Sequence, residues 1–212
     1  MAKFEHGITG PFQGKVGTVV GSSWKGIPYM KATYKKRTKK ITETEKGNRI
    51  KFAMAQSWLS PLLDFVRVGY KGYTPRVEGY IAAKSYLLKN AFEGVAPDLN
   101  INPALMKVSY GNLPLSDNIT VEKTDDNKLI FSWDPSYMED SDYSDQVMLL
   151  AYCPRGDNSP INYTTNGQFR KTGTDILELT NEKGLAYHIY FAFIAHDRSR
   201  QSDSVYLRTV TT

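Results

Sequence analysis

The chain has 212 residues, of which 41% are hydrophobic and 23% charged, and a formal net charge of +5 at pH 7. These fractions are typical of globular domains and exclude a largely disordered chain, and the length suits one medium domain or two small ones. No apolar run approaches the roughly 20 residues of a membrane-spanning helix, and no secretory signal is evident, so we expect a cytoplasmic or particle-associated protein. The only cysteine, Cys153, lies in an apolar run, which favours a buried, inert thiol.

Charge is distributed unevenly along the chain. Residues 1–51 hold twelve Lys and Arg against three Glu, a local net charge of +9, and residues 52–113 carry a net +2. Residues 114–212 hold nine basic against fifteen acidic residues, a net −6. A positive segment beside a negative body predicts three alternatives: it binds an anionic polymer, it binds the body of a neighbouring copy, or it stays solvated.

The first predicted element is the glycine-rich stretch of residues 10–26. Its glycine spacing is one residue too short for a Walker phosphate loop, and Lys15 is not followed by the magnesium-binding hydroxyl. We expect KVGTVVG and WKGIPYM to form a two-stranded β-element that the helices or a neighbouring copy must cover, because an isolated hairpin is marginal in water. Its glycines permit bends or close backbone approach. The positions concerned are Gly14, Gly17 and Gly21, with Val16, Val19 and Val20 as a small apolar surface between them.

Aromatic and basic residues are interleaved in the same segment and beyond it. Lysine and arginine neutralise phosphates, and aromatic rings stack on exposed bases, so this pattern predicts a contact with an anion or a nucleic acid. The same pattern also occurs on plain sheet surfaces, and no recognised nucleic-acid motif accompanies it. The candidate contact residues are Trp24, Lys25, Tyr29, Lys31, Tyr34, Lys35, Lys36, Arg37, Lys39 and Lys40.

A helical region is predicted over residues 42–104. Thr42 and Glu45 stand at capping-box spacing before a run of apolar positions, which predicts a helix that Pro61 breaks or kinks. The chain is then expected to continue helically toward Gly72. The predicted apolar positions of the first helix are Ile50, Phe52, Ala53, Ala55, Trp58 and Leu59.

A further helix is predicted to begin with Thr74 as N-cap and Pro75 at its first position, and to end at Gly94. A helical hairpin of this kind buries a core or docks a partner, and the spacing favours neither. Its predicted packing face comprises Val77, Ile81, Leu88 and Phe92, with Tyr80 and Leu87 at the flank.

From about residue 105 the hydrophobic period changes from helical to alternating. Seven short strands bounded by turn residues predict an antiparallel sandwich, with a hairpin around Asp126 and Asn127. The strands after this hairpin are expected in QVMLLAYC, INYTT, DILELT, AYHIYFAFIAH and SVYLRTV.

Residues 105–212 resemble the fibronectin type III and immunoglobulin-like sandwich. LIFSWDPS is similar to its tryptophan-bearing second strand, and LAYHIYFAFIAHDRSRQSDSVYLRTVTT is similar to its last two strands. The resemblance implies that Trp133 is a core tryptophan and that Tyr187 forms a tyrosine-corner hydrogen bond. The lack of paired cysteines favours the fibronectin type III branch.

A second resemblance covers nearly the whole chain. GKVGTVVGSSWKGIPYM, TETEKGNRIKFAMAQSWLSPL and the ending SDSVYL resemble a bacterial family catalogued only as a domain of unknown function, whose N-terminal motif reads GKVGxVVGxxWKGxxY. That family has an arginine shortly after the motif tyrosine, where this sequence has Lys31, so bidentate anion binding there is not implied. The resemblance implies that the glycine block, helices and sandwich occur together, and it brings no established activity.

Catalytic and metal-binding patterns are weak. His196, Asp197 and Ser199 supply the residue types of a triad, but three neighbours at a strand end favour an exposed polar turn. The acidic run MEDSDYSD lacks the register of an EF-hand and favours a solvated loop. We expect no catalytic residue, metal or cofactor.

The expected fold is α+β: a glycine-rich β-element (residues 1–41), a helical hairpin (42–104) and an antiparallel fibronectin type III-like sandwich (105–212). The favoured function is a non-enzymatic assembly or protein-interaction protein, including a structural component of a larger particle. The alternative is a nucleic-acid-associated protein that binds phosphate through its basic N-terminal segment. A protein partner or self-assembly is expected and no membrane span.

Overall fold

The structure is a computed structural model that describes residues 3–4, 10–36, 38–73, 77, 79–180 and 182–212. The chain divides into two compact units, Met1–Thr42 and Glu43–Thr212. The architecture is α+β, as the sequence predicted, with helices confined to the second unit in the described residues and antiparallel pairing throughout.

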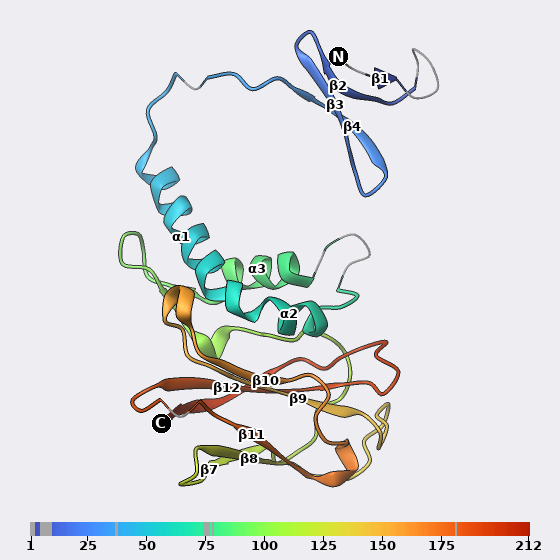
Figure 1. Ribbon diagram of the computed structural model, residues 1–212, viewed down its shortest axis with the longest axis vertical. Helices are drawn as coiled ribbons and strands as arrows, with labels where there is room; N and C mark the ends of the chain where they lie inside the picture. The colour runs from blue at the N-terminus through green and yellow to red at the C-terminus, as the bar shows by residue number, and fades with distance from the viewer. Residues whose placement is uncertain (1–2, 5–9, 37, 74–76, 78, 181) are drawn as a thin grey trace. The chain divides into compact units, whose positions relative to one another are not determined.

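The first unit is a four-stranded antiparallel sheet in the order β1-β2-β3-β4 (Figure 1). Its strands are β1 (Lys3–Phe4), β2 (Phe12–Val16), β3 (Val19–Trp24) and β4 (Ile27–Ala32). The predicted two-stranded element was therefore wrong, because each quoted stretch contains a turn. Gly17 (φ 56°) lies between β2 and β3, and Lys25 (φ 47°) with Gly26 (φ 79°) forms a two-residue turn between β3 and β4. In a two-residue hairpin turn, positive φ at both central residues gives the turn a twist that matches the right-handed twist of the two strands it joins.

Three helices open the second unit. They are α1 (Glu43–Leu59), α2 (Leu63–Gly69) and α3 (Gly79–Asn90), and a 3₁₀ turn, η1 (Ser60–Leu62), separates the first two. Pro61 lies in this turn, so the predicted interruption of the helix is confirmed, for the reason that proline lacks a donor for the helical ladder. Within α1, Ala55, Trp58 and Leu59 are buried as predicted, whereas Ile50 and Phe52 are exposed.

The predicted packing face of the third helix was correct only in part, because Leu87 is buried and Tyr80, Leu88 and Phe92 pack against the core, but two other members are exposed. Ala82, Ala83 and Leu87 are the buried residues of α3, whereas Ile81 is 50% exposed and Val77 is 38% exposed. The small alanines allow a close approach to the neighbouring helices, which the pattern of large apolar residues did not indicate. The predicted caps Thr74 and Pro75 lie outside the described residues, and the helix ends at Asn90, before Gly94.

All seven strands predicted beyond residue 105 are present. Their bounds are β7 (Thr120–Lys123), β8 (Lys128–Ser132), β9 (Gln146–Tyr152), β10 (Ile161–Thr164), β11 (Thr174–Glu178), β12 (Ala186–Ile194) and β13 (Val205–Thr211). They form a four-stranded sheet, β10-β9-β12-β13, and a three-stranded sheet, β11-β8-β7. A short pair, β5 (Phe92–Glu93) with β6 (Asn100–Ile101), and the 3₁₀ turns η2 (Pro103–Leu105), η3 (Gly156–Asn158) and η4 (Arg170–Thr172) connect these elements.

The four-stranded sheet is the middle of three layers in the second unit (Figure 1). Its residues Met148, Leu150 and Tyr190 join the core under the helices. Leu149 and Phe191, which point the opposite way along the same strands, join the core shared with the three-stranded sheet. Burial of both faces explains why β9 and β12 read as continuous apolar runs, and it buries Cys153 as predicted.

Trp133 is a core tryptophan, as the sequence predicted. It is 4% exposed, its ring lies 5.5 Å from that of Phe191, and its indole N–H donates to the carbonyl of Arg170 at 2.8 Å. The tyrosine-corner prediction was wrong, because the buried hydroxyl of Tyr187 has no hydrogen-bond partner among the described residues. The Tyr187 ring belongs to the core shared by the two sheets.

Three buried tyrosines tie the helical layer and its connections to the sheet. Tyr152 donates to the carbonyl of Trp58 at 2.9 Å, and Tyr190 donates to the carbonyl of Pro103 at 2.7 Å. Tyr70 at the end of α2 donates to the carbonyl of Lys107 at 2.7 Å. Desolvation raises the pKa of all three phenols, since burial disfavours the charged form.

These raised pKa values predict alkaline destabilisation of the second unit. A tyrosine in the unfolded chain ionises with a pKa of about 10. The buried phenols therefore contribute fully to the free energy of unfolding below that pH, and this contribution is lost as pH rises above it. The midpoint of urea unfolding should fall between about pH 10 and 11.5. Tyr70→Phe and Tyr190→Phe remove the ionising groups and should flatten this fall. Equal slopes for the variants and the parent protein would contradict the prediction.

Candidate functional site

The strand register sorts the side chains of the N-terminal sheet onto two different faces. Residues directly opposite each other in an antiparallel pair share a face, and the face alternates along each strand. Lys15, Val20 and Lys31 form one row across the sheet. The next rows on that face pair Ser22 with Tyr29 and Trp24 with Ile27. We call this the basic–aromatic face, and it comprises Lys15, Val20, Lys31, Ser22, Tyr29, Trp24 and Ile27.

The opposite face is apolar. One row contains Val16, Val19 and Ala32, and Met30 lies opposite Gly21 in the next row. The apolar face comprises Phe12, Val16, Val19, Ala32, Gly14, Gly21, Met30, Ser23 and Pro28, and none of these is charged. The predicted apolar surface of three valines is therefore divided, because Val20 belongs to the basic–aromatic face.

Gly21 permits the close backbone approach that the sequence predicted. A Cβ atom at this position would overlap the carbonyl oxygen of Phe12 and approach its ring to 2.6 Å. Gly14 adopts a φ of 107°, so β2 bends where it passes Gly21. A side chain at Gly21 would therefore displace backbone rather than a flexible group.

Among the described residues of the first unit, Phe12 lies against Gly21, and no other segment buries a residue of β2, β3 or β4. All six residues of β4 are exposed, and the exposed fraction reaches 71% for Met30, 48% for Trp24 and 43% for Tyr29. Gly21 is the only residue of β2, β3 and β4 that is buried. A sheet of this size normally needs a packed face for stability, so its apolar face lacks the partner that such a face requires.

The structure brings part of the predicted contact set together. Trp24, Tyr29 and Lys31 lie on the basic–aromatic face, and Lys25 lies in the adjoining turn with its ammonium 5.1 Å from the Trp24 ring centroid. Tyr34, Lys35, Lys36, Lys39 and Lys40 lie on the irregular segment between β4 and α1, and Arg37 lies outside the described residues.

The sequence prediction missed Lys15, which pairs across Val20 with Lys31. Reading Lys25 and Gly26 as a two-residue turn fixes the β3–β4 register and would have identified the aromatic members of the face.

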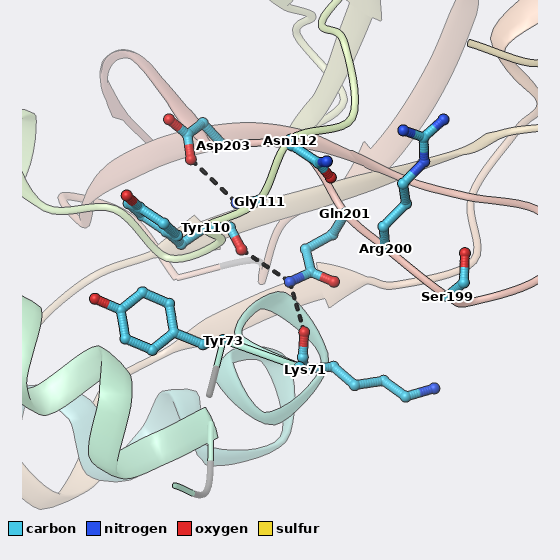
Figure 2. Close-up of a pocket in the computed structure, with 10 residues that line it drawn as sticks. Lys71, Tyr73, Tyr110, Gly111, Asn112, Ser199, Arg200, Gln201 and Asp203 are labelled. Carbon is cyan, nitrogen blue, oxygen red and sulfur yellow. Dashed lines mark hydrogen bonds between the residues drawn. The ribbon is translucent and has the colours of Figure 1, made fainter. Parts of the chain in front are cut away.

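The second unit has an open hollow of about 410 Å³ near the end of α2 (Figure 2). At its centre the Gln201 amide donates to the carbonyls of Lys71 and Tyr110 at 2.9 and 2.8 Å. Asp203 accepts from the Gly111 amide at 3.1 Å and also forms an ion pair with Lys107. These polar groups satisfy one another, so the hollow is a structural junction between the helical layer and the β12–β13 connection.

Other candidate catalytic groups also have structural partners. The Asp197 carboxylate accepts from the Ser199 amide at 2.9 Å, which confirms the predicted exposed turn. In the acidic run, Asp140 binds the Arg200 guanidinium at 2.6 and 2.9 Å, and Asp145 is buried beside Arg170. The described residues hold no group of three or more His, Cys, Asp or Glu side chains suited to a metal ion.

Comparison with known protein families matches residues 11–208 to a family of unknown function, DUF6266. The chain belongs to this family. The DUF6266 match begins one residue before β2 and ends within β13, so it spans both compact units. No curated protein and no solved structure matches this DUF6266 chain, so its fibronectin type III-like character stays a prediction. No helix in the described residues has the length and apolar character needed to cross a membrane.

Proposed function

We propose that this protein is a non-enzymatic assembly protein whose N-terminal sheet associates with the same sheet of a second copy. The observation that carries the proposal is the uncovered apolar face, above all Met30 at 71% exposure. Buried apolar surface is the main stabilising contribution to a small sheet. Association with another apolar surface would supply the burial that the described residues of the first unit do not provide.

Charge placement restricts where a second copy can bind. Residues 1–42 hold nine Lys and Arg against one Glu, a net charge of +8, so most self-contacts of this unit would be repulsive. The apolar face avoids this repulsion, because Lys15 and Lys31 project from the other face. Two such sheets packed apolar face to apolar face lie about 10 Å apart with their lysines directed outward. A two-fold, self-complementary contact of this kind closes as a dimer.

The contact area limits the strength of this dimer. Three strands about 4.8 Å apart and about six residues long cover a footprint of roughly 300 Å². Two copies then bury roughly 600 Å², well below the roughly 1,200–2,000 Å² of stable interfaces. We therefore expect a weak, concentration-dependent dimer rather than an obligate one.

Met30→Glu tests the apolar face. A carboxylate in the centre of this contact must be desolvated or excluded, so the dissociation constant should rise at least about tenfold, equivalent to about 1.4 kcal/mol. Sedimentation equilibrium over a wide concentration range measures the change. Ser22→Glu introduces the same charge on the opposite face and serves as the matched control, which should dimerise like the parent protein.

Two results would contradict the proposal. A parent protein that stays monomeric up to about 1 mM would exclude a second copy as the occupant, since that concentration corresponds to only about 4 kcal/mol of binding. A dimer that Met30→Glu leaves intact would place the contact elsewhere on the chain.

A further inference from the structure

The geometry points to a second binding site on the same sheet: we propose that the basic–aromatic face binds a single-stranded polynucleotide. This site does not rest on the proposed self-association, because it lies on the other face of the sheet. Its chemistry combines the two groups that hold single strands without sequence preference, namely cations for the phosphates and aromatic rings for the bases.

The cations lie at one end of the face and just beyond it. Lys15 and Lys31 flank Val20 in a single row, and both are exposed. Lys35 and Lys36 lie on the segment after β4, separated from its end by two residues, and are also exposed. A polyanion lying along β4 would pass from the sheet onto this lysine-rich segment, where each neutralised phosphate releases condensed counterions.

The aromatic rings lie toward the other end of the same face. Trp24 pairs with Ile27, and Tyr29 follows two residues later on β4, so the two aromatic residues are diagonal neighbours. They are 48% and 43% exposed, which leaves surface for stacking. Lys25 over the Trp24 ring adds a positive charge beside the first stacking position.

The spacing of the rows favours an extended strand over a duplex. Successive rows on one face of a strand lie about 6.7 Å apart, because each residue advances the chain by about 3.3–3.4 Å. This is twice the roughly 3.4 Å rise along the helix axis that separates successive stacked bases in DNA. Trp24, Tyr29 and Lys31 would therefore contact successive units of an unstacked single strand, and a duplex does not expose its bases for such stacking.

The test uses the full-length protein and a fluorescein-labelled 20-nucleotide oligothymidine, with anisotropy measured across a salt series. The double variant Trp24→Ala/Tyr29→Ala should weaken binding at least tenfold, since loss of one base–aromatic stack costs about 1–3 kcal/mol. The double variant Lys15→Gln/Lys31→Gln should weaken binding and reduce the slope of log K against log salt by about 1.4, at about 0.7 for each contact to a single strand.

Matched variants in the second unit distinguish binding at this face from an effect of the overall charge or aromatic content of the protein. Tyr137→Ala/Tyr143→Ala removes two exposed tyrosines, and Lys89→Gln/Lys183→Gln removes two exposed lysines. Both should bind the oligonucleotide like the parent protein. Amide chemical-shift dispersion of residues 12–32 establishes that the sheet is folded in the N-terminal variants.

Three outcomes would overturn the proposal. One is no binding of the oligonucleotide by the parent protein at low salt. Another is equal weakening by the N-terminal variants and their second-unit controls. The third is equally tight binding of polyglutamate of matched charge with no effect of Trp24→Ala/Tyr29→Ala, which would assign the face to an acidic polypeptide instead. Met30→Glu should bind the oligonucleotide with unchanged affinity per chain, which distinguishes this site from the proposed dimer contact.

Discussion

Replacing Asp145 with alanine is expected to destabilise the second unit by about 3–5 kcal/mol, the cost of leaving a buried charge without its partner. Arg170 is fully buried, and its Nε atom lies 3.5 Å from the Asp145 carboxylate. Burial lowers the pKa of Arg170, and Asp145 opposes that shift. For a unit of this size the loss corresponds to a decrease in melting temperature of roughly 6–20 °C.

The expected effect is large because Arg170 joins several parts of the fold. Its guanidinium donates to Ser116 at 2.9 Å and to the carbonyl of Pro114 at 2.6 Å, and it lies 3.9 Å from the ring centroid of Phe193. Its own carbonyl accepts the Trp133 indole hydrogen bond. Removing Asp145 leaves this charge inside the core with hydrogen bonds but without a countercharge.

Two further variants distinguish charge from packing. Asp145→Asn keeps the side-chain size and an acceptor for the Asp142 amide, so it should still lose most of the stability if the charge is decisive. Asp145→Ala/Arg170→Met removes both charges and should recover part of the loss, because an apolar pair needs no desolvated countercharge. Differential scanning calorimetry provides the measurement, and a single-variant loss under about 1 kcal/mol would contradict the expectation.

Gly21→Val is expected to unfold the N-terminal sheet while leaving the melting of the second unit unchanged. The new side chain would collide with the backbone of Phe12. A small sheet with an exposed apolar face has a low free energy of unfolding, so it cannot tolerate this collision. Both the dimer and the polynucleotide affinity should then be lost together. Amide chemical shifts of residues 12–32 report the unfolding directly.

Ser23→Val is the matched control for this prediction. It places the same side chain on the same strand and face, but at an exposed position opposite Pro28. Valine favours strands, so this variant should retain the sheet. A folded sheet in Gly21→Val, with native shifts for residues 12–32, would show that Phe12 does not require glycine beneath it.

The sequence predicted the β-rich part of the fold well because its signals are local. Alternating apolar residues and turn residues located all seven strands, and Trp133 was correctly placed in the core. The helical layer was less predictable, because its packing depends on surfaces far apart in the sequence. Ala82 and Ala83 are buried for their small size, whereas the larger Ile81 remains exposed, and no periodic pattern of large apolar residues indicates this.

The candidate site was also predictable only in part from the sequence. The interleaved aromatic and basic residues predicted Trp24, Tyr29 and Lys31 as contact residues, and the structure adds that these three share a face. The separate apolar face around Met30 could not be inferred without the strand register, because a shift of one residue exchanges the two faces. The sequence also gave no signal for the polar junction around Gln201, whose partners Lys71 and Tyr110 are distant along the chain.

The order in which the strands are synthesised has a consequence for folding on the ribosome. The N-terminal sheet pairs only residues within its own short segment, so it can form soon after emergence. The middle layer of the second unit cannot form early, because β9 pairs with β12 (Ala186–Ile194) near the end of the chain. Until then α1, α2 and α3 have an apolar surface without its sheet, so a chain truncated before residue 186 should be a substrate for chaperones or proteases.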